Sequence, residues 1–316
     1  MNSYESIFKE MGESARAASI VLQQLPEVRI NEILCDMADA LVQHSEKILI
    51  ANNMDMDSAR GVVPNTMLDR LLLSKERIHQ MAEGVRQVSL LPSPVGTVLE
   101  NIDRPNGLHI EKRAVPFGVI GIIFEARPNV TVDAGALCFK TANATILRGG
   151  KEAFRTNRII VSIMQDVLES HNLPRTAIQL VEVLDREAVS VLLQQRRYID
   201  VVIPRGGAGL IQRVVRDSMI PVIETGSGIC HTYVDAEANI DMAVDIAVNA
   251  KVQRPSVCNS METLLVHSSI AKEFLLALET KLAHHHVTIH GTPEVLQIVN
   301  GVPVDDNSFE TEYNDF

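Results

Sequence analysis

The chain has 316 residues, of which 46% are hydrophobic, and this length and composition suit a globular protein of two domains rather than one small core. Acidic residues outnumber basic ones by 40 to 29, which gives a formal net charge of −11. A generally basic surface for nucleic acid is therefore excluded, and any anionic ligand must be met by a local cluster of Arg and Lys.

The N-terminal segment is polar and acidic, unlike a secretion signal, and the longest apolar run, AVPFGVIGIIF at 114–124, is too short to cross a membrane. These features predict a cytoplasmic protein without a membrane anchor. The four cysteines show no CxxC spacing, so we expect reduced thiols and neither a zinc knuckle nor a disulfide framework. They are Cys35, Cys138, Cys230 and Cys258.

Roughly the first ninety residues are predicted to form a helical scaffold. Apolar residues recur at spacings of three and four from 3 to 24, and this helix should stop at Pro26. Its apolar stripe is Ile7, Met11, Ala15, Ala18 and Leu22. The face of the next helix is Ile30, Ile33, Leu34, Met37 and Leu41. Further helical patterns occupy 45–60, 66–73 and 75–89.

A hairpin is predicted at 97–115. Two extended runs, TVLENI and GLHIEKRAV, are joined by DRPNG, whose Pro and Asn-Gly favour a turn. A hairpin between a helical layer and a sheet often projects, so both an oligomer contact and an ordinary edge hairpin remain open.

After Pro116 the pattern alternates between strand and helix. FGVIGIIF at 117–124 is a continuous apolar run, as in strands that are buried on both faces. Such alternation predicts a parallel, right-handed, doubly wound sheet whose ligands bind beyond the carboxyl ends of the strands. The five expected strands are 117–124, 144–150, 177–183, 198–207 and 220–224, and the four helices are 129–142, 151–170, 186–195 and 208–217.

Two Gly-rich turns follow expected strands, RGGKE at 148–152 and PRGGAG at 204–209, and each carries an Arg. A backbone that approaches phosphates needs such glycines, although neither turn matches GxGxxG. A single turn of this kind is more often a structural loop than a phosphate site. Two of them in one sheet of an acidic protein keep both interpretations open.

The segment KVQRPSVCNSMET at 251–263 holds Cys258, the residue best suited to covalent chemistry. The cations Lys251 and Arg254 flank it, and a strand-like run follows at 263–267, so the thiol should lie on a loop that ends on a rigid strand. Nearby positive charge would favour the thiolate, which attacks an electrophilic carbonyl. The alternative is a small buried apolar residue, the more common situation of a single Cys.

A second α/β unit is expected around this segment, so that Cys258 would lie where the two units meet. The histidines at 284–286, together with His290, fall at a helix end, where solvated or dipole-paired histidines are the ordinary explanation, and we expect no metal site. The elements of this unit are a helix at 240–251, a strand at 262–267, a helix at 269–283, a strand at 287–290 and a helix at 292–299.

Four blocks follow one another along the chain: VPFGVIGIIFEARPNVTVDAGALCFKTANATILRGGKEA, PRGGAGLI, PVIETGSGICHTYVD and VQRPSVCNSMETLLVH. Together they resemble the gamma-glutamyl phosphate reductase family of the aldehyde dehydrogenase superfamily. The resemblance implies a doubly wound α/β, aldehyde-dehydrogenase-like fold with a cofactor domain, a second α/β catalytic domain and a projecting hairpin. The expected parts are the N-terminal helices of the cofactor domain (1–96), the hairpin as a candidate oligomerisation element (97–115), the dinucleotide-binding sheet (116–225) and the catalytic domain (226–316).

The resemblance also implies an activity, the second step of proline biosynthesis. In this step NADPH reduces L-glutamyl 5-phosphate to L-glutamate 5-semialdehyde with release of phosphate. By the same resemblance Cys258, next to Asn259, is the nucleophile. A thiolate can displace phosphate from an acyl phosphate without a strong general acid and leaves a thioester that accepts hydride. Two alternatives are oxidation of a free aldehyde and a non-catalytic, truncated paralogue.

The oxyanion formed in this chemistry needs hydrogen-bond donors, which the amide of Cys258 and one side chain would supply. Many oxidising relatives use an Asn, and in the block EARPN the matching residue is Arg127, with Asn129 close by, so the donor remains open. Glu224 falls in the block that carries the general base of oxidising relatives. A base that activated water would hydrolyse the thioester, so Glu224 is expected to be structural or to hold the nicotinamide ribose.

For the cofactor NADP(H), similarity to the superfamily places the 2′-phosphate near Arg148 and Lys151. The glycines of the two turns would allow close approach of the cofactor, and they are Gly149, Gly150, Gly206 and Gly207. Since Arg binds phosphate and carboxylate in bidentate fashion, Arg127, Arg205 and Arg254 are candidate partners of the substrate.

Members of this family continue past the final residues FETEYNDF. We therefore expect the catalytic domain of this chain to be incomplete, with an exposed sheet edge, and the chain alone to aggregate or to be a poor catalyst. A homo-oligomer is expected of the full-length form. Glutamate 5-kinase is a candidate partner that would channel the substrate.

Overall fold

The computed structural model describes residues 3–224, 226, 228–255, 257–305, 307–310 and 313. The chain divides into two compact units, Met1–Thr225 and Gly226–Phe316. Each unit has a hydrophobic core of its own.

The first unit begins with the predicted helical scaffold, which is confirmed. Its helices are α1 (Ser3–Leu22), α2 (Glu27–Gln43), α3 (Ser45–Ala59), α4 (Asn65–Leu71) and α5 (Lys75–Leu90). The stripe expected on α1 is wrong at its first residue, because Phe8 is buried and Ile7 is 37% exposed. The phenyl ring of Phe8 occupies the position in the hydrophobic core that the periodicity assigned to Ile7. The predicted face of α2 is confirmed.

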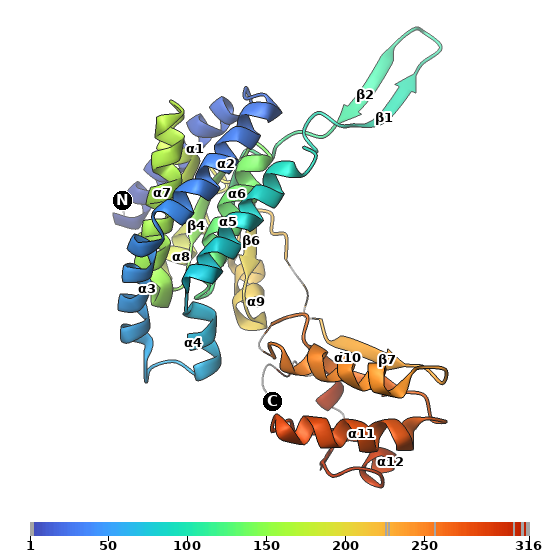
Figure 1. Ribbon diagram of the computed structural model, residues 1–316. Helices are drawn as coiled ribbons and strands as arrows, with labels where there is room; N and C mark the ends of the chain where they lie inside the picture. The colour runs from blue at the N-terminus through green and yellow to red at the C-terminus, as the bar shows by residue number, and fades with distance from the viewer. Residues whose placement is uncertain are drawn as a thin grey trace. The chain divides into compact units, whose positions relative to one another are not determined.

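The predicted hairpin is also confirmed: β1 (Val98–Asp103) pairs antiparallel with β2 (His109–Arg113). It extends away from the helices of the first unit (Figure 1), and nearly all of its side chains are exposed. The turn uses Gly107 with a φ of +83°, a conformation that glycine adopts without strain. The glycine of the Asn-Gly pair therefore takes the left-handed conformation that the turn requires.

Four parallel strands form the sheet of the first unit in the order β5-β4-β3-β6. The chain runs outward from β3 through β4 to β5 and then crosses to the other side of β3, so the winding reverses between β3 and β6. In such sheets the crevice at the carboxyl ends of these two strands is the usual ligand site. The strands are β3 (Val119–Phe124), β4 (Ala144–Arg148), β5 (Ile178–Leu180) and β6 (Val201–Arg205). The helices are α6 (Pro128–Lys140), α7 (Phe154–Ser170), α8 (Arg186–Leu192) and α9 (Ala208–Asp217), with short 3-10 turns η1 (Lys151–Ala153) and η2 (Arg175–Ala177).

The fifth strand expected at 220–224 is wrong. Only Val222 bridges to Val202, through hydrogen bonds from the Val202 amide to the Pro221 carbonyl and from the Ile223 amide back to Val202. Pro221 has no amide to donate, and most of the segment is exposed, so the pairing does not extend.

One ion pair joins α1 to the start of the sheet. The guanidinium of Arg16 donates to both carboxylate oxygens of Asp200, at 2.7 and 3.0 Å, and Asp200 also accepts from the amide of Val119 at 2.8 Å. Gly118 lies against this pair with a φ of +115°, and a Cβ there would come within 2.4 Å of an Asp200 oxygen. Glycine is required at this position on both counts.

The second unit contains the parallel pair β7 (Cys230–Val234) and β8 (Met261–Val266) with helices α10 (Ile240–Val252) and α11 (Ala271–His284). Strand β7 was not predicted, because CHTYV is mostly polar and shows little apolar pattern. The expected strand at 287–290 is only β9 (His290–Gly291), and the expected helix at 292–299 is only α12 (Pro293–Leu296). β9 pairs with β10 (Val302–Pro303), and the 3-10 turn η3 (Ser308–Glu310) follows.

Candidate active site

The carboxyl ends of β3 and β6 bring two predicted site segments together in the first unit. Phe124 of β3 pairs with Arg205 of β6, and the amide of Glu125 donates to the Arg205 carbonyl at 3.3 Å. Arg127, half-buried, is the N-cap residue of α6, and its amide donates to the Glu125 carbonyl at 2.7 Å. Arg205 therefore ends β6, and Arg127 lies just after the neighbouring strand β3.

The side chain of Glu125 occupies the turn after β6. Its Oε1 accepts a hydrogen bond from the Gly207 amide at 3.0 Å, next to the first turn of α9. A Cβ at Gly206 would come within 2.8 Å of the Glu125 carboxyl carbon. Gly206 therefore makes room for Glu125, a role that sequence reasoning missed because the two residues are far apart along the chain. Gly209, the second residue of α9, has no atom of another element within 4 Å of its Cβ position.

The turn after β4 lies against the loop after β3, because a Cβ at Gly150 would be 2.9 Å from the Ala126 amide nitrogen. Gly149 is buried, and a Cβ there would overlap the side chain of Asn157 at 2.3 Å. Gly149 is thus required for packing inside the protein.

The two cations of this turn have different surroundings. The guanidinium of Arg148 donates to the carbonyls of Gly149, at 2.8 Å, and Leu184, at 3.0 Å, so it ties the end of β4 to the segment that follows β5. Lys151 is exposed in η1. Lys151 is therefore the cation that this turn presents to solvent.

Two further predicted residues lie in the first unit. Asn129 is exposed on α6, and its amide donates to the carboxylate of Asp133, one turn along, at 3.2 Å. Glu224 is exposed after the segment that bridges to β6.

The nucleophile candidate lies in the second unit, on the turn between α10 and β8. Cys258 and its neighbour Asn259 are exposed, and Arg254 is exposed at the start of the same turn. The alternative that Cys258 is a buried apolar residue is wrong. That description fits Cys138 instead, whose burial raises its pKa to about 12.

Two side chains hold the backbone of this turn. Ser260 is buried, and its hydroxyl donates to the carbonyls of Ala250 at 3.3 Å and Lys251 at 3.4 Å, at the end of α10. The thiol of Cys230, the first residue of β7, donates to the Cys258 carbonyl at 3.2 Å. These contacts restrain the turn at the Cys258 carbonyl and at Ser260, on the C-terminal side of the nucleophile. No local signal relates Cys230 to Cys258, 28 residues away.

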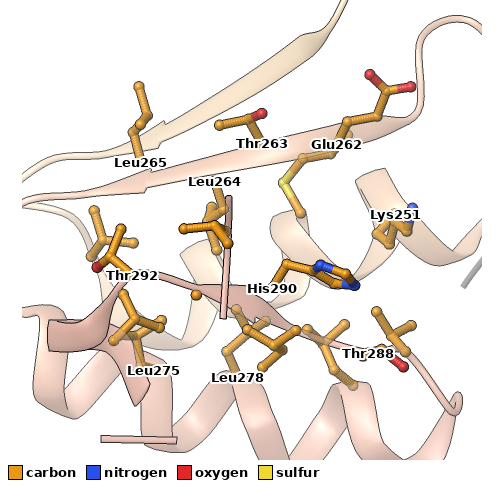
Figure 2. A pocket seen from close by; sticks show the side chains of 18 of the residues that line it. Lys251, Glu262, Thr263, Leu264, Leu265, Leu275, Leu278, Thr288, His290 and Thr292 are labelled. Atoms are coloured by element: carbon orange, nitrogen blue, oxygen red, sulfur yellow. The ribbon is translucent and has the colours of Figure 1, made fainter. Parts of the chain in front are cut away.

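Lys251, which the sequence placed beside the thiol, is buried at the end of α10. Its ammonium group donates to the Tyr313 carbonyl at 3.4 Å. Its side chain also lines a cavity of about 500 Å³ between β8 and α11 (Figure 2).

This cavity is mainly apolar. Leu264 of β8 and Leu275 and Leu278 of α11 line it, and Thr263, Thr288 and His290 add polar groups (Figure 2). Its described lining residues do not include Cys258, so we do not place the chemistry there. Among the residues that the structure describes, no three His, Cys, Asp or Glu side chains are grouped to hold a metal ion. His284 instead contacts the Thr280 carbonyl of its own helix at 2.6 Å.

The predicted site residues thus form two groups. The first unit contains the residues assigned to the cofactor, together with Arg127, Asn129, Arg205 and Glu224. The second unit contains Cys258, Asn259 and Arg254. Across the described part of the chain, no helix has the length and apolar character that a membrane crossing needs.

A family model, sequence relatives and a solved structure all indicate the same family for this chain. The sequence model of the aldehyde dehydrogenase family matches residues 3–295. The gamma-glutamyl phosphate reductase of Moorella thermoacetica is 50% identical over 96% of this chain and 73% of its own length, and that of Serratia marcescens is 48% identical over 97% and 75%. The crystal structure of gamma-glutamyl phosphate reductase from Thermotoga maritima superimposes with a TM-score of 0.86 at 39% identity, over 98% of this chain and 75% of that one. The predicted fold class is confirmed.

Proposed function

We propose a reaction for this chain on the premise that it belongs to the aldehyde dehydrogenase family and, within that family, to the gamma-glutamyl phosphate reductases. It is an oxidoreductase of proline biosynthesis that reduces gamma-glutamyl phosphate. The proposal adds the details: L-glutamyl 5-phosphate and NADPH give L-glutamate 5-semialdehyde and phosphate through a thioester on Cys258.

The observation that carries the covalent mechanism is the exposed thiol of Cys258 on a turn held by Cys230 and Ser260. The thiolate forms a bond to the acyl carbon, and the bond from that carbon to the phosphate oxygen breaks as phosphate leaves with the electron pair. Phosphate is a good leaving group, so this step needs no strong acid. NADPH, when bound, would supply a hydride to the thioester carbon, and the C–S bond would break to release the aldehyde and return the Cys258 thiolate.

The negative charge that develops on the acyl oxygen needs donors that are already in place. The amide of Cys258 is one candidate, since the Cys230 contact restrains the carbonyl of the same residue. Of the two side-chain candidates, Asn129 already donates to Asp133. Arg127, half-buried at the N-cap of α6, is the other candidate.

The residues of the first unit fit a phosphate-bearing dinucleotide. Lys151 offers an exposed cation at the carboxyl end of β4, and the start of α9 carries small residues with open space at Gly209. We assign recognition of the 2′-phosphate mainly to Lys151 and preference for NADPH over NADH to its charge. Arg205 and Arg254 are the proposed partners of the phosphate and carboxylate of the substrate.

The test is the reverse reaction. Glutamate semialdehyde, NADP and phosphate should give NADPH at a rate that depends on phosphate. Oxidation to the free acid without phosphate would support the alternative of an ordinary aldehyde dehydrogenase, and absence of any turnover from a folded chain would support a non-catalytic paralogue.

Three further assignments stay proposals. The exposed hairpin β1–β2 is a candidate contact between copies of the chain, and glutamate 5-kinase is a candidate partner for transfer of the substrate. The cytoplasmic location is proposed from the polar, acidic N-terminal segment and the short apolar run at 114–124.

A further inference from the structure

In the second unit the thiol of Cys230 lies close to the backbone of Cys258. Cys230 Sγ is 3.2 Å from the carbonyl oxygen of Cys258, and both residues reach solvent. A carbonyl oxygen and the Cα of its own residue are about 2.4 Å apart, which puts Cys230 Sγ within about 5.6 Å of the Cα of Cys258. In a disulfide the distance from one Cα to the far sulfur is about 4 Å. A shift of one or two ångströms would therefore bring the two sulfurs into bonding range.

The turn around Cys258 can supply that shift. Cys258 and Asn259 are exposed and lie outside regular structure, between the end of α10 and the start of β8. On the other side, Cys230 is the first residue of β7, and the register of β7 against β8 shifts between Cys230 and His231.

We propose that Cys230 is a resolving thiol that forms a reversible disulfide with Cys258 when hydrogen peroxide oxidises the nucleophile. In the first step the Cys258 thiolate attacks peroxide, takes one oxygen to become a sulfenic acid, and hydroxide leaves. In the second step the Cys230 sulfur attacks the Cys258 sulfur, the S–O bond breaks, and water leaves with the thiol proton. Peroxide is reduced, and the two thiols are oxidised to one disulfide.

The other cysteines do not compete for this pairing within the second unit. Cys138 is buried in the first unit with its pKa raised to about 12, so it is a poor nucleophile at neutral pH. Cys35, also in the first unit, contacts the hydroxyl of Ser89 at 3.5 Å. Without a resolving thiol, a sulfenic acid on an exposed residue is open to oxidation to the irreversible sulfinic acid. The disulfide would protect Cys258 from that fate.

The experiment treats the 316-residue chain with hydrogen peroxide, blocks free thiols and maps tryptic peptides without reductant. Trypsin cleaves after Lys251, which separates the peptide of Cys230 from that of Cys258. We expect a linked pair of these two peptides, lost on treatment with dithiothreitol. Oxygen adducts on Cys258 with no linked pair would overturn the proposal. This readout needs no variant and no activity, so it stands even if the proposed reaction fails.

The matched variant is Cys230→Ser, in which a hydroxyl can still donate to the Cys258 carbonyl. Each protein is compared with its own untreated sample for turnover and for the state of Cys258. After peroxide and then dithiothreitol, the parent should recover most of its activity, whereas Cys230→Ser should recover roughly tenfold less and carry sulfinic acid on Cys258. Cys35→Ser should behave like the parent. Equal recovery by Cys230→Ser and the parent would show that Cys230 does not resolve the oxidised nucleophile.

Discussion

Cys258 combines an exposed thiol with a main chain that is held by Ser260 and Cys230. Replacing it with Ala removes the nucleophile and little packing, so turnover should vanish while the fold and NADPH affinity stay nearly unchanged. Cys258→Ser should also be nearly inactive, because an alkoxide is unavailable at neutral pH. Turnover is measured as phosphate-dependent formation of NADPH, and the fold is checked by circular dichroism.

The controls are the two cysteines of the first unit. Cys138→Ala should retain activity and lose about 1 kcal/mol of stability, because the thiol is buried in the core. Cys35 is exposed, not part of the buried face of α2, so Cys35→Ala should cost less. Activity of Cys258→Ala equal to that of the parent would contradict the covalent mechanism.

Replacements of the two cations after β4 should have different effects, one on cofactor affinity and the other on stability. Lys151→Gln removes an exposed charge and is expected to weaken NADPH by about 1–3 kcal/mol while leaving NADH little changed. Arg148→Gln breaks hydrogen bonds to two carbonyls and should lower the free energy of unfolding by about 1–2 kcal/mol. Titration with each cofactor and urea denaturation make both measurements. An equal loss of affinity for NADPH and NADH in Lys151→Gln would move the phosphate site elsewhere.

Among the elements, α7 depends on a carboxylate from α3. Asp55 is buried, and it accepts from the Thr156 amide at 2.8 Å, the Thr156 hydroxyl at 2.7 Å and the Arg155 guanidinium at 3.2 Å. The contact satisfies an amide in the first turn of α7, where anionic groups are favourable. Asp55→Ala should cost about 2–4 kcal/mol in urea denaturation.

Asp57, on the same helix but exposed, is the matched control. Its carboxylate is 3.4 Å from Arg60, and surface pairs of this kind contribute little. Asp57→Ala should change stability by less than about 0.5 kcal/mol. Equal effects of the two replacements would mean that the cap does not stabilise α7.

A second contact, between α2 and α6, should respond to pH. The buried Lys140 ammonium donates to Glu27 at 3.0 Å, and this hydrogen bond, with a second from the Ser93 amide, lowers the pKa of the Glu27 carboxyl below 4.5. A lowered pKa in the folded state gives stability that is complete above the ordinary value and is lost as the pH falls through the folded value. In Glu27→Gln the decrease of Tm between about pH 6 and pH 3 should be smaller than in the parent. Lys140→Met, which removes the donor, should flatten the profile in the same way, and an unchanged profile in both would contradict this assignment.

For the whole molecule, the two separate cores predict two units that open independently. Hydrogen exchange of the amides should show this in Asp55→Ala. Exchange should rise in α3, α7 and the four-stranded sheet, while the amides of β7 and β8 keep the parent rates. A parallel rise in both units would show that they unfold together.

The sequence by itself determined the elements whose signal is local. The helical scaffold, the hairpin at its Asn-Gly turn and the buried strand β3 follow from periodicity and turn chemistry, which depend on neighbouring residues. The four blocks also indicated the family and Cys258 as nucleophile, whereas the roles of the other site residues stay predictions.

Only the tertiary structure decided what the long-range contacts do. The carboxylate of Glu125 accepts a hydrogen bond from the amide of Gly207, 82 residues away along the chain. The thiol of Cys230 donates to the carbonyl of Cys258, 28 residues away. In the same way, the guanidinium of Arg148 donates to the carbonyl of Leu184. The expected fifth strand is limited at Pro221 to a single bridge between Val222 and Val202. Hydrogen bonds between distant residues depend on which strand ends the sheet places side by side, and hydrophobic periodicity carries no information about that placement.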